Sequence, residues 1–201
     1  MGILDSMRKL IDIGHDASEN IARSFSELTG EMTDVQFLGV RFMPLEFLTE
    51  QFDDRTYKVV RIDFNGVLSG KSLMLLPEED AVKLEKLLLI DIIWDSLVDK
   101  SDLPDYKEME VSVMGEVANI IIAAFLNVFA NALNSEINIT TPEFIKDSGF
   151  SVVESVVVEM AEKLDIALIF DNKINILGRY PINCNILILI DPETIEQLDN
   201  L

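Results

Sequence analysis

The same order of predicted elements occurs twice along the chain, and this repetition constrains the fold more than any other feature of the sequence. In each half a long amphipathic helix comes first, followed by short strands and a shorter helix with acidic residues at its start. The first half is predicted to contain a helix at 3–28, strands at 35–42, 57–64 and 72–76, and a helix that opens at Pro77-Glu78-Glu79-Asp80. The second half is predicted to contain a helix at 107–134, a strand near 137–144, a helix at 152–164, strands at 166–176 and 182–190, and a last helix that opens at Pro192-Glu193.

A repeat of this kind predicts an α+β fold with a pseudo-twofold axis. Two copies are too few for a solenoid. The strands of both halves are therefore expected to form one mixed, largely antiparallel sheet, with the two long helices and the shorter helices packed on it. The polar segment 99–105 contains Pro104 and marks the boundary between the halves. We interpret residues 1–201 as one domain, with a first half at about 1–98 and a second half at about 107–201.

The charge of the chain limits its partners. The 201 residues carry a formal net charge of −20 at pH 7, so nucleic acid and anionic membrane surfaces should repel the protein. The single cysteine, Cys184, cannot form an internal disulfide, and the first residues do not resemble a signal peptide. The most apolar stretch, 117–133, is short for a membrane span and contains three asparagines. These features indicate a soluble, cytoplasmic protein.

The second long helix carries an unusual polar stripe. At 3.6 residues per turn, one narrow face collects small polar residues with a single charge, while apolar residues occupy the opposite face and both flanks. The stripe consists of Ser112, Glu116, Asn119, Ala123, Asn127, Asn131 and Asn134. Asparagine is a poor helix former, and Lys or Glu would suit a solvated face better. The periodicity is equally compatible with a functional site and with an interhelix or dimer contact held by asparagine hydrogen bonds.

The equivalent face of the first long helix is an ordinary charged surface. It carries residues of both signs, several of them paired at i,i+4: Arg8, Asp12, His15, Glu19, Arg23 and Glu27. The two halves have therefore diverged, and the unusual face belongs to the second half alone.

The spacing within the second stripe resembles the motif of the CheC, CheX and FliY family of chemotaxis response-regulator phosphatases, and the chain looks CheC-like. Ser112, Glu116, Asn119 and Pro142 follow one another in the order Ser-x3-Glu-x2-Asn-x22-Pro. The local sequence of residues 115–120, Gly-Glu-Val-Ala-Asn-Ile, is similar to that family as well. The twofold layout extends the resemblance over essentially the whole chain.

The resemblance implies a function and a role for each residue of the motif. The substrate would be the aspartyl phosphate of a CheY-like response regulator, Asn119 would orient the attacking water, and Glu116 would pair with the active-site lysine of the regulator. Ser112, Ala123 and Asn127 would form the docking surface, and Pro142 would have a structural role. The chain would contribute no metal and no nucleophile, because the regulator supplies Mg²⁺. Phosphoryl transfer needs little beyond such positioning and charge stabilisation.

The first half matches the motif less well, which implies one working site. Asp12 and His15 stand where the family has Glu and Asn, Arg8 replaces the leading residue, and Leu38 stands in place of proline. Imidazole cannot reproduce the donor and acceptor of a carboxamide. The alternative function is that of a non-enzymatic adaptor for a chemotaxis partner such as CheD or a flagellar-switch component. An unrelated small-molecule enzyme is disfavoured, because the sequence has no glycine-rich phosphate loop and only one histidine.

Overall fold

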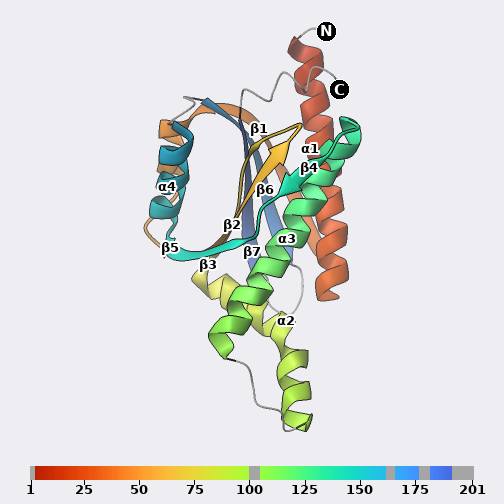
Figure 1. The fold of residues 1–201 in the computed structure, drawn as a ribbon, viewed down its shortest axis with the longest axis vertical. Helices are drawn as coiled ribbons and strands as arrows, with labels where there is room; N and C mark the ends of the chain where they lie inside the picture. The colour runs from red at the N-terminus through yellow and green to blue at the C-terminus, as the bar shows by residue number, and fades with distance from the viewer. Residues whose placement is uncertain (1–2, 100–104, 162–165, 177–181, 192–201) are drawn as a thin grey trace.

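The computed structural model describes residues 3–99, 105–161, 166–176 and 182–191 (Figure 1). Helices and strands follow one another as α1 (Ile3–Thr29), β1 (Thr33–Pro44), the short 3₁₀ helices η1 (Leu45–Phe47) and η2 (Thr49–Gln51), β2 (Thr56–Gly66), β3 (Gly70–Pro77), α2 (Glu78–Asp99), α3 (Tyr106–Ala132), β4 (Ile137–Ile139), β5 (Glu143–Ser148), α4 (Gly149–Ala161), β6 (Ile166–Ile176) and β7 (Ile182–Ile190).

The strands form one sheet in the order β1-β6-β7-β3-β2, and β4 and β5 both pair with the outer edge of β2. All pairs among the described strands are antiparallel. The sheet interleaves strands from the two halves, because β6 and β7 lie between β1 and β3. The predicted α+β class with a largely antiparallel sheet is confirmed.

The register of the strands shows the pseudo-twofold relation directly. At the centre of the sheet, Leu73 of β3 pairs with Leu187 of β7. Leu73 pairs on its other side with Arg61 of β2, and Leu187 pairs with Asp171 of β6. Farther out, β5 pairs with β2 in the same way that β1 pairs with β6. Exchanging the two halves therefore leaves the order of the strands unchanged.

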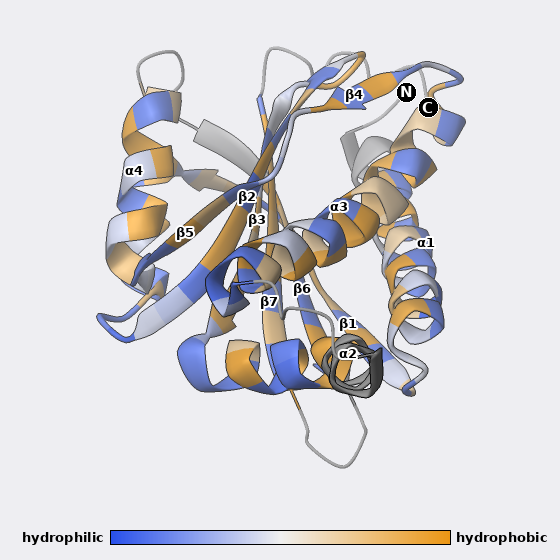
Figure 2. Cartoon of the chain, turned by 60° about the horizontal axis from the view of Figure 1, so that its bottom comes forward, coloured by the Kyte–Doolittle hydropathy of each residue, from blue (hydrophilic) through white to orange (hydrophobic). Residues whose placement is uncertain are grey.

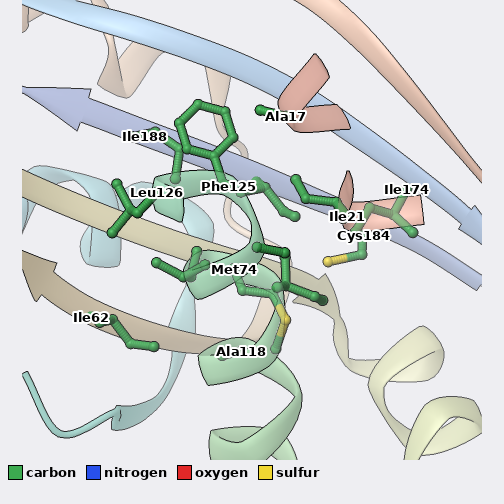
Figure 3. Packing of buried hydrophobic residues seen from close by; sticks show 14 of the residues in the cluster. Ala17, Ile21, Ile62, Met74, Ala118, Phe125, Leu126, Ile174, Cys184 and Ile188 are labelled. Atoms are coloured by element: carbon green, nitrogen blue, oxygen red, sulfur yellow. The ribbon is translucent and has the colours of Figure 1, made fainter. Parts of the chain in front are cut away.

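Helices cover both faces of the sheet (Figure 2). The long helices α1 and α3 pack with the start of α2 on one face, over a large apolar core that includes Phe125, Phe129 and Phe170. Figure 3 shows part of this core, in which side chains of α1 and α3 meet side chains of the central strands. On the other face, α4 and the two 3₁₀ helices enclose a smaller core.

The outer strands of the two halves are interrupted at matching positions. In β1 an extra residue, Leu38, lies between Phe37 and Gly39, and the register to β6 shifts there. On the opposite edge, residues 140–142 separate β4 from β5. There the Asp63 N–H of β2 donates to the Thr140 hydroxyl at 3.0 Å, and the Thr140 N–H donates to the Asp63 carbonyl at 2.9 Å. Both interruptions are β-bulges, which bend a strand and redirect its side chains.

Most predicted elements are confirmed, with two differences. The strand predicted near 137–144 is two strands, because the bulge lies within it. The two 3₁₀ helices at 45–51 are absent from the prediction. Helix α1 ends where expected, since Gly30 adopts a φ of +68° and its N–H donates to the Ser26 carbonyl at 2.9 Å. Most of the predicted boundary segment 99–105, the end of the helix predicted at 152–164 and the helix predicted at Pro192-Glu193 lie outside the described residues.

Helix α3 is a core helix. By length and composition it is the one described helix that could cross a membrane, but half of its apolar stretch is buried inside the fold. Its first turn is capped by Asp105, whose carboxylate accepts a hydrogen bond from the Lys107 N–H at 3.0 Å.

Candidate functional site

The polar stripe of α3 faces outward, as its spacing predicts. Ser112, Glu116 and Asn127 are exposed, and Asn119 and Ala123 are half-buried. The side chains on the opposite side of the helix are fully buried, with Met114, Ala118, Ile121 and Phe125 all at zero exposure. The helix is therefore held firmly by its apolar faces while one stripe remains accessible.

The first part of this stripe lines an open hollow of about 460 Å³. One wall is α3, which contributes Val111, Ser112, Gly115, Glu116 and Asn119. The other wall is the strand end and bulge that follow, with Ile139, Thr140, Thr141 and Pro142. All four residues of the sequence motif line this one hollow, although 22 residues lie between Asn119, the last helical member, and Pro142.

The two walls of the hollow approach each other at Gly115 and Pro142. A Cβ atom added to Gly115 would lie 3.6 Å from Pro142 Cβ and 3.9 Å from Pro142 Cγ, which is ordinary van der Waals contact. Pro142 therefore packs opposite the bare backbone of α3 between Ser112 and Glu116. Pro142 thus forms part of the wall opposite α3, and its structural role stays a prediction.

Glu116 and Asn119 are suited to act together on a bound group. They lie three positions apart on the same helix, so their side chains project from the same side, less than one turn apart. Glu116 is the exposed member and Asn119 the more buried one. The hollow thus offers an anionic acceptor near its rim and a carboxamide, which both donates and accepts hydrogen bonds, deeper inside.

Two predicted docking residues lie outside the hollow. Ala123 and Asn127 follow on the same face of α3, one and two turns past Asn119, but they do not line this space. Conversely, sequence reasoning missed Val111, Ile139, Thr140 and Thr141, which do line it. Ile139, Thr140 and Thr141 directly precede Pro142 in the sequence. Their place in the hollow could not be predicted from this, because it depends on the bulge that the chain forms there.

The corresponding face of the first half has a different surface. Asp12 and His15 are both exposed on α1, and the His15 ring packs edge-on against Phe37 with ring centres 4.9 Å apart. Leu38, at the bulge where the second half has Pro142, is 56% exposed. A second hollow, of about 700 Å³, lies between α1 and α3, but it is lined by Asp16, Glu19 and neighbouring residues and not by Asp12 or His15.

Metal ligands do not gather in the part of the chain that the structure describes. No group of three or more His, Cys, Asp or Glu side chains is placed there to hold an ion. The buried thiol of Cys184 lies in the main core, and burial raises its pKa well above the ordinary range for a thiol, which disfavours the reactive thiolate.

Comparison with known proteins points to one family. Residues 109–145, which contain the whole motif, match the model of the CheC-like family. A Halobacterium salinarum protein provisionally named CheY-P phosphatase CheC1 is 26% identical over 164 residues, which are 82% of this chain and 80% of that protein.

Solved structures show the same fold over nearly the whole chain. The crystal structure of FliY from Thermotoga maritima is similar with a TM-score of 0.69 and 15% identity, over 97% of this chain and 94% of that one. The CheX–CheY–BeF₃–Mg²⁺ complex from Borrelia burgdorferi contains a chain that is similar with a TM-score of 0.52 and 16% identity, over 89% of this chain and 96% of that one. The resemblance that the sequence indicates is thereby confirmed: the motif lies in the stretch that matches the CheC-like family model, and the fold is similar to that of the FliY structure.

Proposed function

We propose that this protein hydrolyses the aspartyl phosphate of a CheY-like response regulator and that the hollow beside α3 is its active site. The observation that carries the proposal is the convergence of Ser112, Glu116, Asn119 and Pro142 on one accessible hollow. The names of the similar proteins support it, since one refers to a CheY-P phosphatase and another to a complex with CheY.

In the proposed mechanism the regulator docks against α3 with its phosphorylated aspartate at the hollow. The Asn119 carboxamide accepts a hydrogen bond from a water molecule and holds it in line with the phosphorus atom. Water attacks phosphorus, the bond from phosphorus to the aspartate oxygen breaks, and inorganic phosphate and the free carboxylate of the regulator are released. The chemistry rests on positioning and charge stabilisation, so this chain needs no nucleophile of its own.

The remaining residues fix the partner. Glu116, exposed at the rim, forms an ion pair with the active-site lysine of the regulator and so sets the docking angle. Ser112, one turn earlier on the same face, contacts the regulator beside it. The Mg²⁺ that such regulators bind would come with the partner and neutralise charge on the phosphoryl group.

The test is the rate of phosphate loss from a phosphorylated CheY-like regulator of the same organism in the presence of Mg²⁺. Asn119→Ala should lower kcat by at least roughly 10²-fold, by analogy with the loss of one positioned polar group from an active site. Asn131→Ala is the matched control, because Asn131 is an exposed asparagine on the same helix outside the hollow. A folded Asn119→Ala protein with wild-type activity would reject the proposed site.

The second candidate function is that of an adaptor. The charged outer face of α1, with Asp12 and His15 exposed, favours this candidate, because it offers a surface unlike the hollow in the second half. CheD or a flagellar-switch component would be the partner. The same assay separates the two functions: an adaptor binds its partner without accelerating phosphate loss, and Asn119→Ala then has no effect.

A further inference from the structure

A buried group of charged side chains connects the candidate active-site helix to the sheet. Lys58 of β2 points toward the face covered by α2 and α3, where its side chain is only 5% exposed. Its ammonium group bonds to the Glu85 Oε1 of α2 at 2.7 Å and also to the Glu110 carboxylate of α3. The Tyr106 hydroxyl donates to the second oxygen of Glu85 at 3.3 Å. Glu85 is fully buried and the Glu110 side chain is 15% exposed.

This group is costly to bury, so stability alone does not explain it. Two carboxylates and one ammonium lose most of their hydration, and apolar side chains of similar size at such positions are often as stabilising or more so. Burial opposes the charged form of Lys58, but its hydrogen bonds with Glu110 and Glu85 outweigh this effect and raise its pKa. The group does fix the positions of β2, α2 and α3 relative to one another.

Strand β2 also holds the other wall of the hollow. Five residues after Lys58, the backbone of Asp63 makes the two hydrogen bonds to Thr140 that form the bulge next to Pro142. The Asp63 carboxylate is in turn bound by Arg61 at 2.8 Å and by Lys71 at 3.0 Å. One strand is therefore bonded to both walls: to α3 through Lys58, and to the bulge through Asp63.

We infer that the Lys58–Glu110 ion pair is a positioning element for the phosphatase site. It holds the first turns of α3 against β2, so that Ser112 and Glu116 stand where docking of the regulator requires them. This inference rests on the proposed function. Glu110 precedes Ser112 by two residues and Glu116 by six, which corresponds to about 9 Å along the helix axis. A helix transmits a displacement over that distance, and misplacement of a site by about 1 Å can cost up to 10²-fold in rate.

Variants at Glu110 test the inference with the least risk to folding. Glu110→Ala removes the tether but leaves Lys58 paired with Glu85, so no buried charge loses all its partners. Glu110→Gln keeps an oxygen that can accept from the Lys58 ammonium and should restore the tether. Glu108→Gln changes an exposed acid in the first turn of the same helix and is the matched control.

Two measurements are needed: steady-state kinetics with the phosphorylated regulator, and amide hydrogen exchange of residues 110–116. Glu110→Ala should lower kcat/KM about tenfold, mainly by raising KM, and should speed exchange in this segment about tenfold or more, since local opening becomes easier. Glu110→Gln and Glu108→Gln should stay within about threefold of wild type in both measurements. In a Glu116→Ala background, Glu110→Ala should have little further effect on KM, because both changes remove the same docking contact.

A folded Glu110→Ala protein with wild-type KM and wild-type exchange would overturn the inference. A Glu110→Gln protein as impaired as Glu110→Ala would overturn it too, because the tether survives in that variant. If wild-type protein does not accelerate phosphate loss at all, the proposed function fails and exchange alone decides: faster exchange in Glu110→Ala supports the positioning role, and unchanged exchange refutes it.

Discussion

Replacement of Gly115 by alanine should stabilise this protein and at the same time impair the proposed activity. Gly115 lies in the middle of α3, where a glycine costs about 1 kcal/mol relative to alanine. The new methyl group would meet Pro142 at 3.6 Å, so it needs no rearrangement. The gain in helix propensity should therefore appear almost in full as a higher free energy of unfolding.

The expected magnitude follows from the size of the chain. At about 2.1 cal/mol/K per residue, 201 residues unfold with an entropy near 0.4 kcal/mol/K, so a gain of about 1 kcal/mol raises Tm by roughly 2 °C. The same methyl group occupies the space between α3 and Pro142, beside Ser112 and Glu116. If the regulator requires that space, kcat/KM should fall about tenfold, which corresponds to about 1.4 kcal/mol of steric cost.

Gly14→Ala is the contrasting control. Gly14 is also helical, but a Cβ atom there would lie 2.2 Å from the Phe37 ring, which packs against His15 and Phe170. This variant should lose about 1–3 kcal/mol from overpacking, partly offset by the same helix propensity. Calorimetry of both variants and the phosphatase assay check the reasoning. A lower Tm for Gly115→Ala, or an equal rise for both, would show that the packing around these glycines has been misjudged.

Three further outcomes are expected. Phe125→Ala should cost about 3–5 kcal/mol in denaturant unfolding, because the ring is fully buried against Phe129 and Phe170; a cost below 1 kcal/mol would contradict this packing. The hydrogen bond from Arg61, together with that from Lys71, lowers the pKa of Glu159 from 4.5 to about 2. The stabilising contribution of Glu159 should therefore be complete above about pH 4.5 and disappear as the pH falls through 2, so Glu159→Gln should flatten the acid side of the curve of unfolding midpoint against pH. His15→Ala should leave phosphate release within about twofold of wild type, and a larger loss would assign the first half a share in the activity.

The sequence was sufficient for most of the helices and strands because their apolar periods are strong. The bounds predicted for β6 and β7 agree with the structure, and the outward stripe of α3 follows from helical spacing alone. The bulge at 140–142 escaped prediction, because the break in alternation between the apolar residues 139 and 144 does not by itself distinguish a bulge from the end of a strand. The extra residue becomes visible only against the partner strand, since a bulge is a property of a pair of strands.

The part of the candidate site that lies within one helix could be predicted from the sequence, and the part that comes from other elements could not. Ser112, Glu116 and Asn119 belong to one helix, so their spacing places them on one side. Thr141 joins them only through the fold. Lys58 resembles an ordinary strand residue in the sequence, because its two acidic partners lie on separate helices that tertiary packing brings together.

The interleaved order of the strands has a consequence for synthesis on the ribosome. Neither half can complete its part of the sheet alone, since β1 must wait for β6 and β3 for β7. About 130 residues separate the end of β1 from the end of β6, which at roughly 5–20 residues per second takes roughly 7 to 26 s. During that time the emerging first half exposes unpaired strand edges, the kind of surface on which nascent chains associate. Production of this protein should therefore depend on chaperones that shield strand edges until the second half has emerged.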